Sequence, residues 1–439
     1  MRLTKFTIPL LLLSGLVFFK PAGAQLCQGS LGDPIVNISF GSGANPGPPL
    51  SAATTNYSFR SGDCPNDGFY SVVNRTSACF SSTWHSVSSD HTGNANGYFM
   101  LVNASYQPSA FYIDTVDVLC HSTTYEFAAW ILNMIRLSTC SGGSIQPNLT
   151  FSVEKPDGTV LQSVNTGDIP SSPVPTWKQY GFFFTTPADV SRVVVRIVNN
   201  APGGCGNDLA LDDITFRPCG PLLDASIAGG QVVKEFCEGE AQPQVFTCKV
   251  SAGYTNPYFQ WQESLDNGSK WTDIPGANGI TLGKTFSSST PAGIYQYRLS
   301  VARVENLGIA QCKINSNVLT VKVYANPAKT VSVSGPFCEG HAITFSASGG
   351  SQYHWTGVNG FAATVASVTL DNAQPSRAGS YFLEVGNDAG CRRRDTVEVM
   401  IHPRPVATVR TDRFFICEGV AVTLESSGGS AYSWTPFAS

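Results

Sequence analysis

Residues 338–355 read CEGHAITFSASGGSQYHW, and this stretch decides the fold of the second half of the chain because it recurs. Residues 417–434 read CEGVAVTLESSGGSAYSW, with the same interval of 17 residues between the cysteine and the tryptophan. An earlier and longer copy starts at Cys237-Glu238-Gly239 and reaches Trp261. Self-similarity along a chain is typical of tandem modules. We therefore expect a row of similar domains from residue 221 onward.

The first two copies share a later signature, Ala292-Gly293-Ile294-Tyr295 and Ala378-Gly379-Ser380-Tyr381, which opens a strand of alternating pattern. Proline-containing linkers follow at Asn326-Pro327 and at 403–405. The predicted units are 221–325, 326–403 and 404–439. The last unit reaches Trp434 but not its Ala-Gly-x-Tyr strand, so we expect a truncated third domain in a fragment of a longer protein. The truncation also accounts for the odd total of 13 cysteines.

Residues 25–220 have a different texture, with long strand-like runs such as 124–136 and 190–199. Turn signals such as Pro156-Asp157-Gly158 separate these runs, and no segment has a helical period. About ten strands without helices indicate two packed sheets, hence a sandwich or a jelly roll. The net charge of −4 offers no broad attraction to nucleic acid or anionic lipid.

The N-terminus is typical of an export signal. Arg2 and Lys5 precede an apolar run over 6–19, and Ala22-Gly23-Ala24 is a small-residue cleavage site. We expect residues 1–24 to be removed and the mature chain to be secreted or held at the cell surface, because no other stretch is long and apolar enough to span a bilayer.

Thirteen cysteines in an exported chain predict a disulfide framework. Cys64 and Cys79 flank a short turn, Cys140 and Cys205 lie in glycine-rich loops, and Cys27, Cys120 and Cys219 compete for one bond, of which Cys120–Cys219 is favoured. The repeat register pairs Cys338 with Cys391 and Cys237 with Cys312. Cys248 and Cys417 have no assignable partner.

The cysteine, the tryptophan and the later tyrosine strand resemble an immunoglobulin-type sandwich, with the tryptophan on the third strand and the tyrosine at the start of the sixth. The repeats look like the Ig-like and PKD-like modules of large Bacteroidetes surface proteins. In the N-terminal part, Gly203 to Ile214, Asp90 to Gly93 and Thr124 to Trp130 resemble the N-terminal jelly-roll domain of such proteins, which is similar to MAM domains and carbohydrate-binding modules.

This resemblance implies an all-β chain: an N-terminal jelly-roll sandwich followed by tandem Ig-like sandwiches, the last truncated. Such chains often end in a gliding-motility or type IX secretion module, which residues 404–439 do not contain.

Asp212 and Asp213 lie in an alternating strand, so one of them must face inward or towards the rim. A buried carboxylate needs a partner, and Ca²⁺ accepts oxygen ligands. The resemblance adds Asp90 as a further ligand. We expect a structural Ca²⁺ at Asp90 and one of Asp212 and Asp213; the alternative is that these acids cap turns or accept backbone N–H bonds. His91, beside Asp90, is expected to serve the metal or a turn.

No nucleophile elbow, zinc-binding helix motif or phosphate loop is present in the sequence. We therefore expect a non-catalytic binding or adhesion protein, with the jelly roll as the head that binds an extracellular glycan or surface protein and the repeats as its stalk. Trp84, Tyr106 and Tyr112 are candidates for a sugar platform, with packing in the core or at the rim as the alternative. The alternatives for the whole chain are a glycan-degrading jelly-roll hydrolase, with Asp208 and Glu126 as an imaginable acid pair, and a purely structural surface-coat protein.

Overall fold

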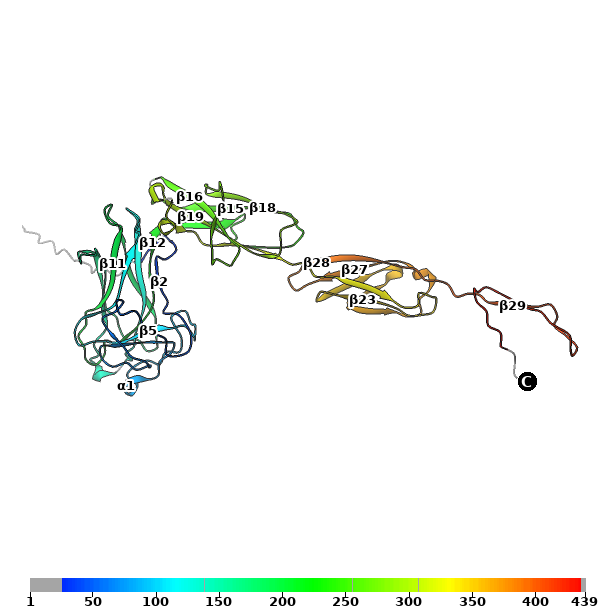
Figure 1. The fold of residues 1–439 in the computed structure, drawn as a ribbon, viewed down its shortest axis with the longest axis horizontal. Coiled ribbons are helices and arrows are strands. Elements are labelled where there is room, and N and C mark those ends of the chain that lie inside the picture. Colours follow the sequence, from blue (N-terminus) through cyan, green and yellow to red (C-terminus); the bar gives the residue numbers. More distant parts are fainter. Residues whose placement is uncertain (1–25, 138, 255, 307, 436–439) are drawn as a thin grey trace, which may run out of the picture. The chain divides into compact units, whose positions relative to one another are not determined.

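The computed structural model describes residues 26–435 except 138, 255 and 307, so the predicted signal peptide lies outside the described residues. The described chain is nearly all β and forms several separate sheets (Figure 1). It divides into two compact units. The first comprises 26–232, 245–283 and 296–319, and the second comprises 233–244, 284–295 and 320–435.

The N-terminal sandwich, which we call the head, is built from two antiparallel sheets. The larger sheet has the order β10-β7-β12-β5-β4-β3, with β1 and β2 also on β12, and the smaller has the order β6-β11-β8-β9. Its elements are β1 (Ser30–Leu31), β2 (Val36–Ile38), β3 (Ser58–Phe59), β4 (Phe69–Val73), α1 (Cys79–Ser82), β5 (Phe99–Asn103), β6 (Ser109–Asp117), β7 (Thr124–Asn133), η1 (Cys140–Gly142), β8 (Asn148–Glu154), β9 (Val160–Asp168), β10 (Lys178–Thr185), β11 (Arg192–Asn199) and β12 (Leu209–Gly220).

Alternation along the strands places the apolar side chains of the head between its two sheets. In β11 the buried residues Val193, Val195 and Ile197 alternate with more exposed neighbours, as a half-buried strand requires. Phe127 on β7 packs edge-on against Phe151 of the opposite sheet, with ring centroids 5.4 Å apart. The expected jelly-roll sandwich is confirmed.

The first repeat supplies strands to both compact units. In the first unit β15 lies between β13 and β18, β16 lies between β17 and β19, and β20 pairs with β19; in the second unit β14 pairs in parallel with β21. The elements are β13 (Leu223–Ile227), β14 (Val233–Cys237), β15 (Gln242–Val250), β16 (Pro257–Ser264), β17 (Thr272–Asp273), β18 (Thr281–Phe286), β19 (Gly293–Arg303), η2 (Val304–Asn306), η3 (Ala310–Cys312), β20 (Ile314–Asn315) and β21 (Leu319–Tyr324).

The second repeat is an Ig-like sandwich of the sheets β22-β23-β26 and β25-β24-β27-β28. Its elements are β22 (Thr330–Ser334), β23 (Ile343–Ser348), β24 (Gln352–Thr356), η4 (Val358–Gly360), β25 (Ala362–Ala363), β26 (Ser367–Leu370), η5 (Pro375–Arg377), β27 (Gly379–Gly386) and β28 (Arg392–Val399). Trp355 lies on the third strand and Tyr381 near the start of the sixth, as expected, and both are fully buried. The Tyr381 hydroxyl donates to the Arg377 carbonyl at 2.8 Å, which forms the tyrosine corner of this fold.

The third copy contributes an antiparallel pair, β29 (Thr408–Thr411) and β30 (Leu424–Ser427). Its Trp434 is about half exposed, at 48%, whereas the equivalent Trp355 is fully buried. The described part of this copy has no second sheet to cover the tryptophan.

Five disulfides join the described cysteines, and two of them are the expected pairs, Cys64–Cys79 and Cys140–Cys205. The expected pair Cys120–Cys219 is wrong, because Cys219 is bonded to Cys27. The short strand β1 pairs with the end of β12 and so brings the N-terminal segment to Cys219. Cys120 is instead bonded to Cys312 of the first repeat.

The pairs Cys237–Cys312 and Cys338–Cys391 are also wrong, because Cys237 is bonded to Cys391 and Cys338 is free. Cys391 immediately precedes β28, whereas Cys338 forms a parallel bridge with His402 just beyond its end. An eight-residue strand separates the two positions by about 25 Å, far more than the roughly 7 Å that a disulfide spans between Cα atoms. Cys248 and Cys417 are also free, the first buried and the second exposed.

Candidate functional site

A local irregularity in β12 places two predicted residues at a bend of the head. The pairing of β12 with β7 shifts register between Asp212 and Thr215, and Asp213 has a φ of +38°. Such a bulge redirects side chains that strict alternation would send to opposite faces. Asp212 is buried and Asp213 is about one-quarter exposed, and their carboxylates converge on one side chain.

That side chain is His91, which takes the place that the sequence assigned to Asp90. His91 Nδ1 lies 3.1 Å from Asp212 Oδ2 and 3.2 Å from Asp213 Oδ2, and the His91 backbone N–H donates to Asp212 Oδ2 at 3.0 Å. The His91 ring stacks on Trp130, with centroids 4.6 Å apart. Burial raises the pKa of Asp212 to about 6, while the hydrogen bonds from His91 oppose that shift. The three groups form one compact cluster of polar side chains.

Asp90 caps a turn, which is the role that the alternative hypothesis gave to these acids. Its Oδ1 accepts hydrogen bonds from the Thr92 N–H at 2.9 Å, the Thr92 hydroxyl at 2.7 Å and the Asn94 N–H at 2.9 Å. Its charge still reaches Asp213, whose pKa is raised first by burial and also by the Asp90 carboxylate. Asp90 therefore shapes the loop that delivers His91.

The donor set of this cluster differs from the one expected for calcium. The convergent atoms are one imidazole nitrogen and two carboxylate oxygens, whereas Ca²⁺ takes six to eight oxygens. A hydrogen bond from Nδ1 shared by the two carboxylates accounts for the distances. These three donors do not by themselves fit a calcium ion, and a chelation experiment tests whether a structural Ca²⁺ binds at Asp90, Asp212 and Asp213.

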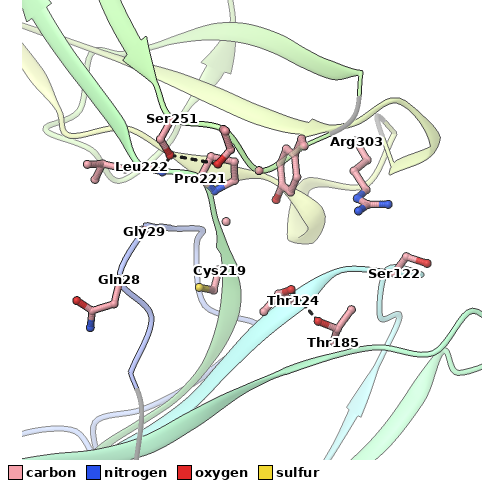
Figure 2. Close-up of a pocket in the computed structure, with 14 residues that line it drawn as sticks. Gln28, Gly29, Ser122, Thr124, Thr185, Cys219, Pro221, Leu222, Ser251 and Arg303 are labelled. Carbon is pink, nitrogen blue, oxygen red and sulfur yellow. Dashed lines mark hydrogen bonds between the residues drawn. The ribbon is translucent and has the colours of Figure 1, made fainter.

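A second feature is an open cleft of about 480 Å³ where the head meets the first repeat, within the first compact unit. Figure 2 shows Ser122, Thr124 and Thr185 of the head opposite Ser251 and Arg303 of the repeat. The remaining lining residues are Gln28, Gly29, Cys219, Gly220, Pro221, Leu222, Ala252, Gly253 and Tyr254.

The cleft is polar and carries one cation. The Thr124 and Thr185 hydroxyls are hydrogen-bonded at 2.9 Å, and Ser251 Oγ accepts the Leu222 N–H at 2.8 Å. The guanidinium of Arg303 lies 5.9 Å from the centre of the Tyr254 ring. Its buried Nε has no hydrogen-bond partner among the described residues, while its Nη1 lies 3.5 Å from Glu305 Oε1. Hydroxyls beside a guanidinium can bind a polar group with negative charge, because Arg presents several donors in a fixed plane.

Contacts between the head and the first repeat hold the two walls of this cleft in place. Besides the Cys120–Cys312 disulfide, Arg298 donates to both carboxylate oxygens of Asp33 at 2.8 and 2.7 Å. Cys312 belongs to the hydrophobic core of the head, and Ile309 packs against that core. No local sequence pattern predicts the cleft, because its lining comes from separate segments scattered between Gln28 and Arg303.

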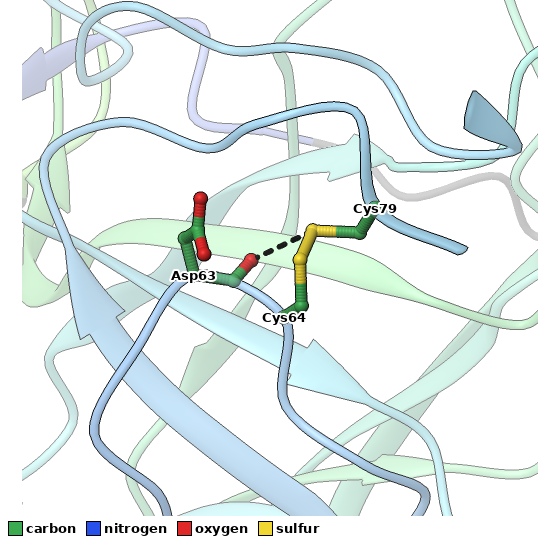
Figure 3. A group of neighbouring side chains, drawn as sticks. All are labelled: Asp63, Cys64 and Cys79. Atoms are coloured by element: carbon green, nitrogen blue, oxygen red, sulfur yellow. Dashed lines mark hydrogen bonds between the residues drawn. A yellow bond between two sulfur atoms is a disulfide. The ribbon is translucent and has the colours of Figure 1, made fainter. Parts of the chain in front are cut away.

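Asp63, Cys64 and Cys79 form another compact group in the head (Figure 3). The two cysteines are bonded to each other, and Cys79 Sγ lies 3.0 Å from the Asp63 carbonyl oxygen. Disulfide sulfurs are not thiolates, and the thiolate is the metal ligand. This group is a structural link.

The imagined acid pair of a glycosidase does not form. Glu126 lies opposite Arg217, and Asp208 directly precedes Leu209, which lies opposite Asn133. Seven residues along β7 correspond to about 23 Å, beyond the roughly 5–9.5 Å between the carboxyls of glycosidases. Glu126 pairs instead with Arg217 at 3.2 Å, and Asp208 accepts the Trp84 indole N–H at 2.9 Å.

The three candidate platform aromatics do not share a surface. Trp84 and Tyr112 are buried in the head, where packing was the alternative reading, and Tyr106 is exposed. Burial raises the pKa of Tyr112, the expected effect of removing a phenol from water.

The fold defines a class, a tandem β-sandwich protein in which a jelly-roll head is followed along the chain by Ig-like repeats. Residues 225–325 match a family model described as a domain of unknown function, DUF8696. No curated protein matches the chain. Among the described residues there is no helix long and apolar enough to cross a membrane.

Several solved structures are similar over part of the chain. The amphioxus IgVJ-C2 molecule is 15% identical, over 38% of this chain and 99% of that chain, with a TM-score of 0.23. The N-terminal four Ig domains of Dscam1 isoform 7.44 are 11% identical, over 72% and 81%, with a TM-score of 0.23. The fibronectin(III)-like modules of Clostridium thermocellum CbhA are 13% identical, over 41% and 94%, with a TM-score of 0.21. At these scores the similarities carry no argument about function.

Proposed function

We propose that this chain is a non-catalytic extracellular binding or adhesion protein, in which the jelly-roll head binds a glycan or a surface protein and the Ig-like repeats act as its stalk, the first repeat also contributing one wall of the binding cleft. The observation that carries the proposal is the polar cleft between the head and the first repeat. Its walls are held by the Cys120–Cys312 disulfide and the paired Arg298–Asp33 hydrogen bonds. A cleft whose walls cannot separate is preorganised, which lowers the entropic cost of binding.

The disulfides support the extracellular part of the proposal. Five disulfides are typical of a protein in oxidising surroundings. Export through the signal at 1–24 is part of the same proposal. So are the origin among Bacteroidetes surface proteins, the MAM-like or carbohydrate-binding-module-like character of the head and the link to gliding motility or type IX secretion, all of which rest on the sequence motifs.

The test uses the full chain on a glycan array and on a panel of immobilised surface proteins. Arg303→Ala should weaken retention at least tenfold, because the guanidinium is the cation of the cleft. Arg410→Ala, a change at an exposed position of β29, is the matched control and should leave retention unchanged.

Two outcomes would contradict the proposal. Release of reducing sugar from a polysaccharide panel would favour the hydrolase alternative. Absence of retention on both surfaces would favour the structural surface-coat alternative.

A further inference from the structure

The Cys-Glu-Gly motif has the same structural position in the first and second repeats. Cys237 ends β14 and lies opposite Tyr324, the last residue of β21, in a parallel pair. Cys338 forms a parallel bridge with His402, just after the last strand of the second repeat. Both cysteines therefore lie at the end of the sandwich from which the chain leaves for the next module.

The glutamate of the motif makes the same hydrogen bonds to the outgoing linker in both repeats. The Glu238 N–H donates to the Tyr324 carbonyl at 2.9 Å, and the Glu339 N–H donates to the His402 carbonyl at 2.8 Å. Two residues further on, the linker N–H donates to the glutamate Oε2 at 3.2 Å in each case, from Asn326 and Arg404 respectively.

The side chain of each linker residue adds a hydrogen bond to the backbone carbonyl of the glutamate. Asn326 Nδ2 donates to the Glu238 carbonyl at 2.7 Å, and Arg404 Nε donates to the Glu339 carbonyl at 3.0 Å. The glycine has a φ of +88° at Gly239 and +83° at Gly340, a region that favours glycine. Gly419 of the third copy has the same conformation, at +83°. The motif is thus one conserved geometry within the chain.

At the first of these ends the cysteine holds the next module. Cys237 is bonded to Cys391, in the loop between β27 and β28 of the second repeat, and Asn387 Nδ2 in that loop donates to the linker carbonyl of Ala325 at 2.9 Å. The equivalent loop of the first repeat carries Cys312, which is bonded to Cys120 of the head. In both cases the loop cysteine is joined to the module that comes before it.

At the second end the geometry is complete and the thiol is free. Cys338 is exposed. The hydrogen bonds between Glu339 and Arg404 match those between Glu238 and Asn326. We propose that the Cys338 end of the second repeat is a covalent docking site for a further Ig-like module, through a cysteine in the loop before the last strand of that module. This inference is independent of the ligand proposed for the head.

The bond forms from two thiols, which release two protons and pass two electrons to a disulfide-bonded oxidant. The oxidant is reduced to a dithiol, as in ordinary thiol–disulfide exchange. The result is a row of sandwiches in which each boundary carries one disulfide.

In the test, a second copy of the second repeat supplies the partner cysteine for Cys338. In the full chain, residues 404–439 are replaced by a second copy of 326–403, which places Asn326 at the position of Arg404. The added copy carries Ala389→Ser as a mass tag beside its Cys391, at an exposed loop position. Mapping of unreduced peptides should link Cys338 of the first copy to the tagged Cys391, and iodoacetamide should then label one of the two Cys338 thiols.

The matched control is the same hybrid with Cys391→Ser in the added copy, in which both Cys338 thiols should be labelled. Three results would overturn the proposal: labelling of both thiols in the unmodified hybrid, a Cys338–Cys391 bond within one copy, or a Cys338–Cys338 dimer between chains.

A second hybrid tests the same rule if the first does not fold. Residues 326–439 are replaced by a further copy of 221–325, and Cys237 of the original copy should then be bonded to Cys312 of the added one. A free Cys237 in this hybrid, folded by near-ultraviolet circular dichroism, would contradict the inference.

Discussion

The head and the Ig-like repeats use disulfides for different purposes. Three bonds lie wholly within the head and tie its own loops and its N-terminal segment. The described repeats have no internal bond, and their bonded cysteines Cys312, Cys237 and Cys391 all join different modules. The repeats are stabilised by aromatic cores instead. In the second repeat the centre of the Phe345 ring lies 5.6 Å from that of Trp355 and 4.6 Å from that of Tyr381.

This difference has an energetic meaning. A disulfide within a domain mainly restricts the unfolded chain, so the head should lose stability when its bonds are removed. A disulfide between two folded domains mainly restricts their relative motion. The repeats should therefore be sensitive to loss of a core aromatic, and their boundaries to loss of a cysteine.

The largest effect is expected from Trp355→Ala in the core of the second repeat. Removal of a fully buried tryptophan should lower the free energy of unfolding of that repeat by about 3–5 kcal/mol. Calorimetry of the full chain should show one transition moved and that of the head unchanged. Trp434→Ala is the matched control at the half-exposed copy of the motif and should cost less than about 1 kcal/mol; equal shifts would contradict the difference in packing.

The next effect compares the two kinds of disulfide directly. Cys140→Ser with Cys205→Ser opens a loop of 65 residues and should lower the stability of the head by about 4 kcal/mol in the chain-entropy model. Cys120→Ala with Cys312→Ala, which puts no hydroxyl into the core of the head, should cost the head less and should expose residues 221–223 to limited proteolysis. If the second pair destabilises the head more than the first, the proposed distinction fails.

A third prediction concerns pH and the buried carboxyl of Asp208. Burial raises its pKa to about 7, against the opposing hydrogen bonds from the Ala104 N–H and the Trp84 indole. Between about pH 4 and pH 7 the folded state then binds more protons than the unfolded state, so the stability of the head falls as pH rises, by up to about 4 kcal/mol. Asp208→Asn should reduce this slope in urea unfolding at pH 4, 5.5 and 7, leaving the smaller contribution of Asp212 and Asp213, whose pKa values burial also raises.

Asp189→Asn, at an exposed carboxyl, is the control for that experiment and should keep the slope of the unaltered chain. Parallel slopes for all three proteins would show that Asp208 does not retain its proton in the folded state.

A smaller effect is expected where the head meets the first repeat. Arg298→Lys keeps the charge but cannot reproduce the two hydrogen bonds to Asp33 or the stacking on Trp271, whose ring centre lies 4.3 Å from the guanidinium. We expect a loss of roughly 1–2 kcal/mol in urea unfolding, with Arg410→Lys as the neutral control. An unchanged midpoint would mean that the disulfide alone holds the joint.

The smallest effect should come from chelation. The cluster of His91, Asp212 and Asp213 is satisfied by its own hydrogen bonds, so EDTA should leave the melting midpoint of the head within experimental error. A rise in the midpoint on addition of Ca²⁺, lost in Asp213→Asn, would instead establish the calcium site.

Local patterns predicted the elements of this protein well where the signal was periodic or repeated. The Cys-Glu-Gly and tryptophan copies indicated Ig-like sandwiches, and Trp355 and Tyr381 occupy the strands expected of them. The carboxylates of Asp212 and Asp213 also come together as a pair. The third member of that group is His91. Asp90 Oδ1 instead accepts N–H hydrogen bonds from its own turn, and residue identity alone does not show which of these roles an aspartate has.

The sequence by itself determined the all-β class, the repeats and the presence of a disulfide framework, because each depends on residue type and spacing along the chain. Only the tertiary structure decided which cysteines form disulfides, where the head and first repeat form a cleft, and which three cysteines stay free. Disulfide partners must come within a few ångströms in space. In the second repeat Cys338 and Cys391 lie at opposite ends of β28, so the partner of Cys391 belongs to the neighbouring module.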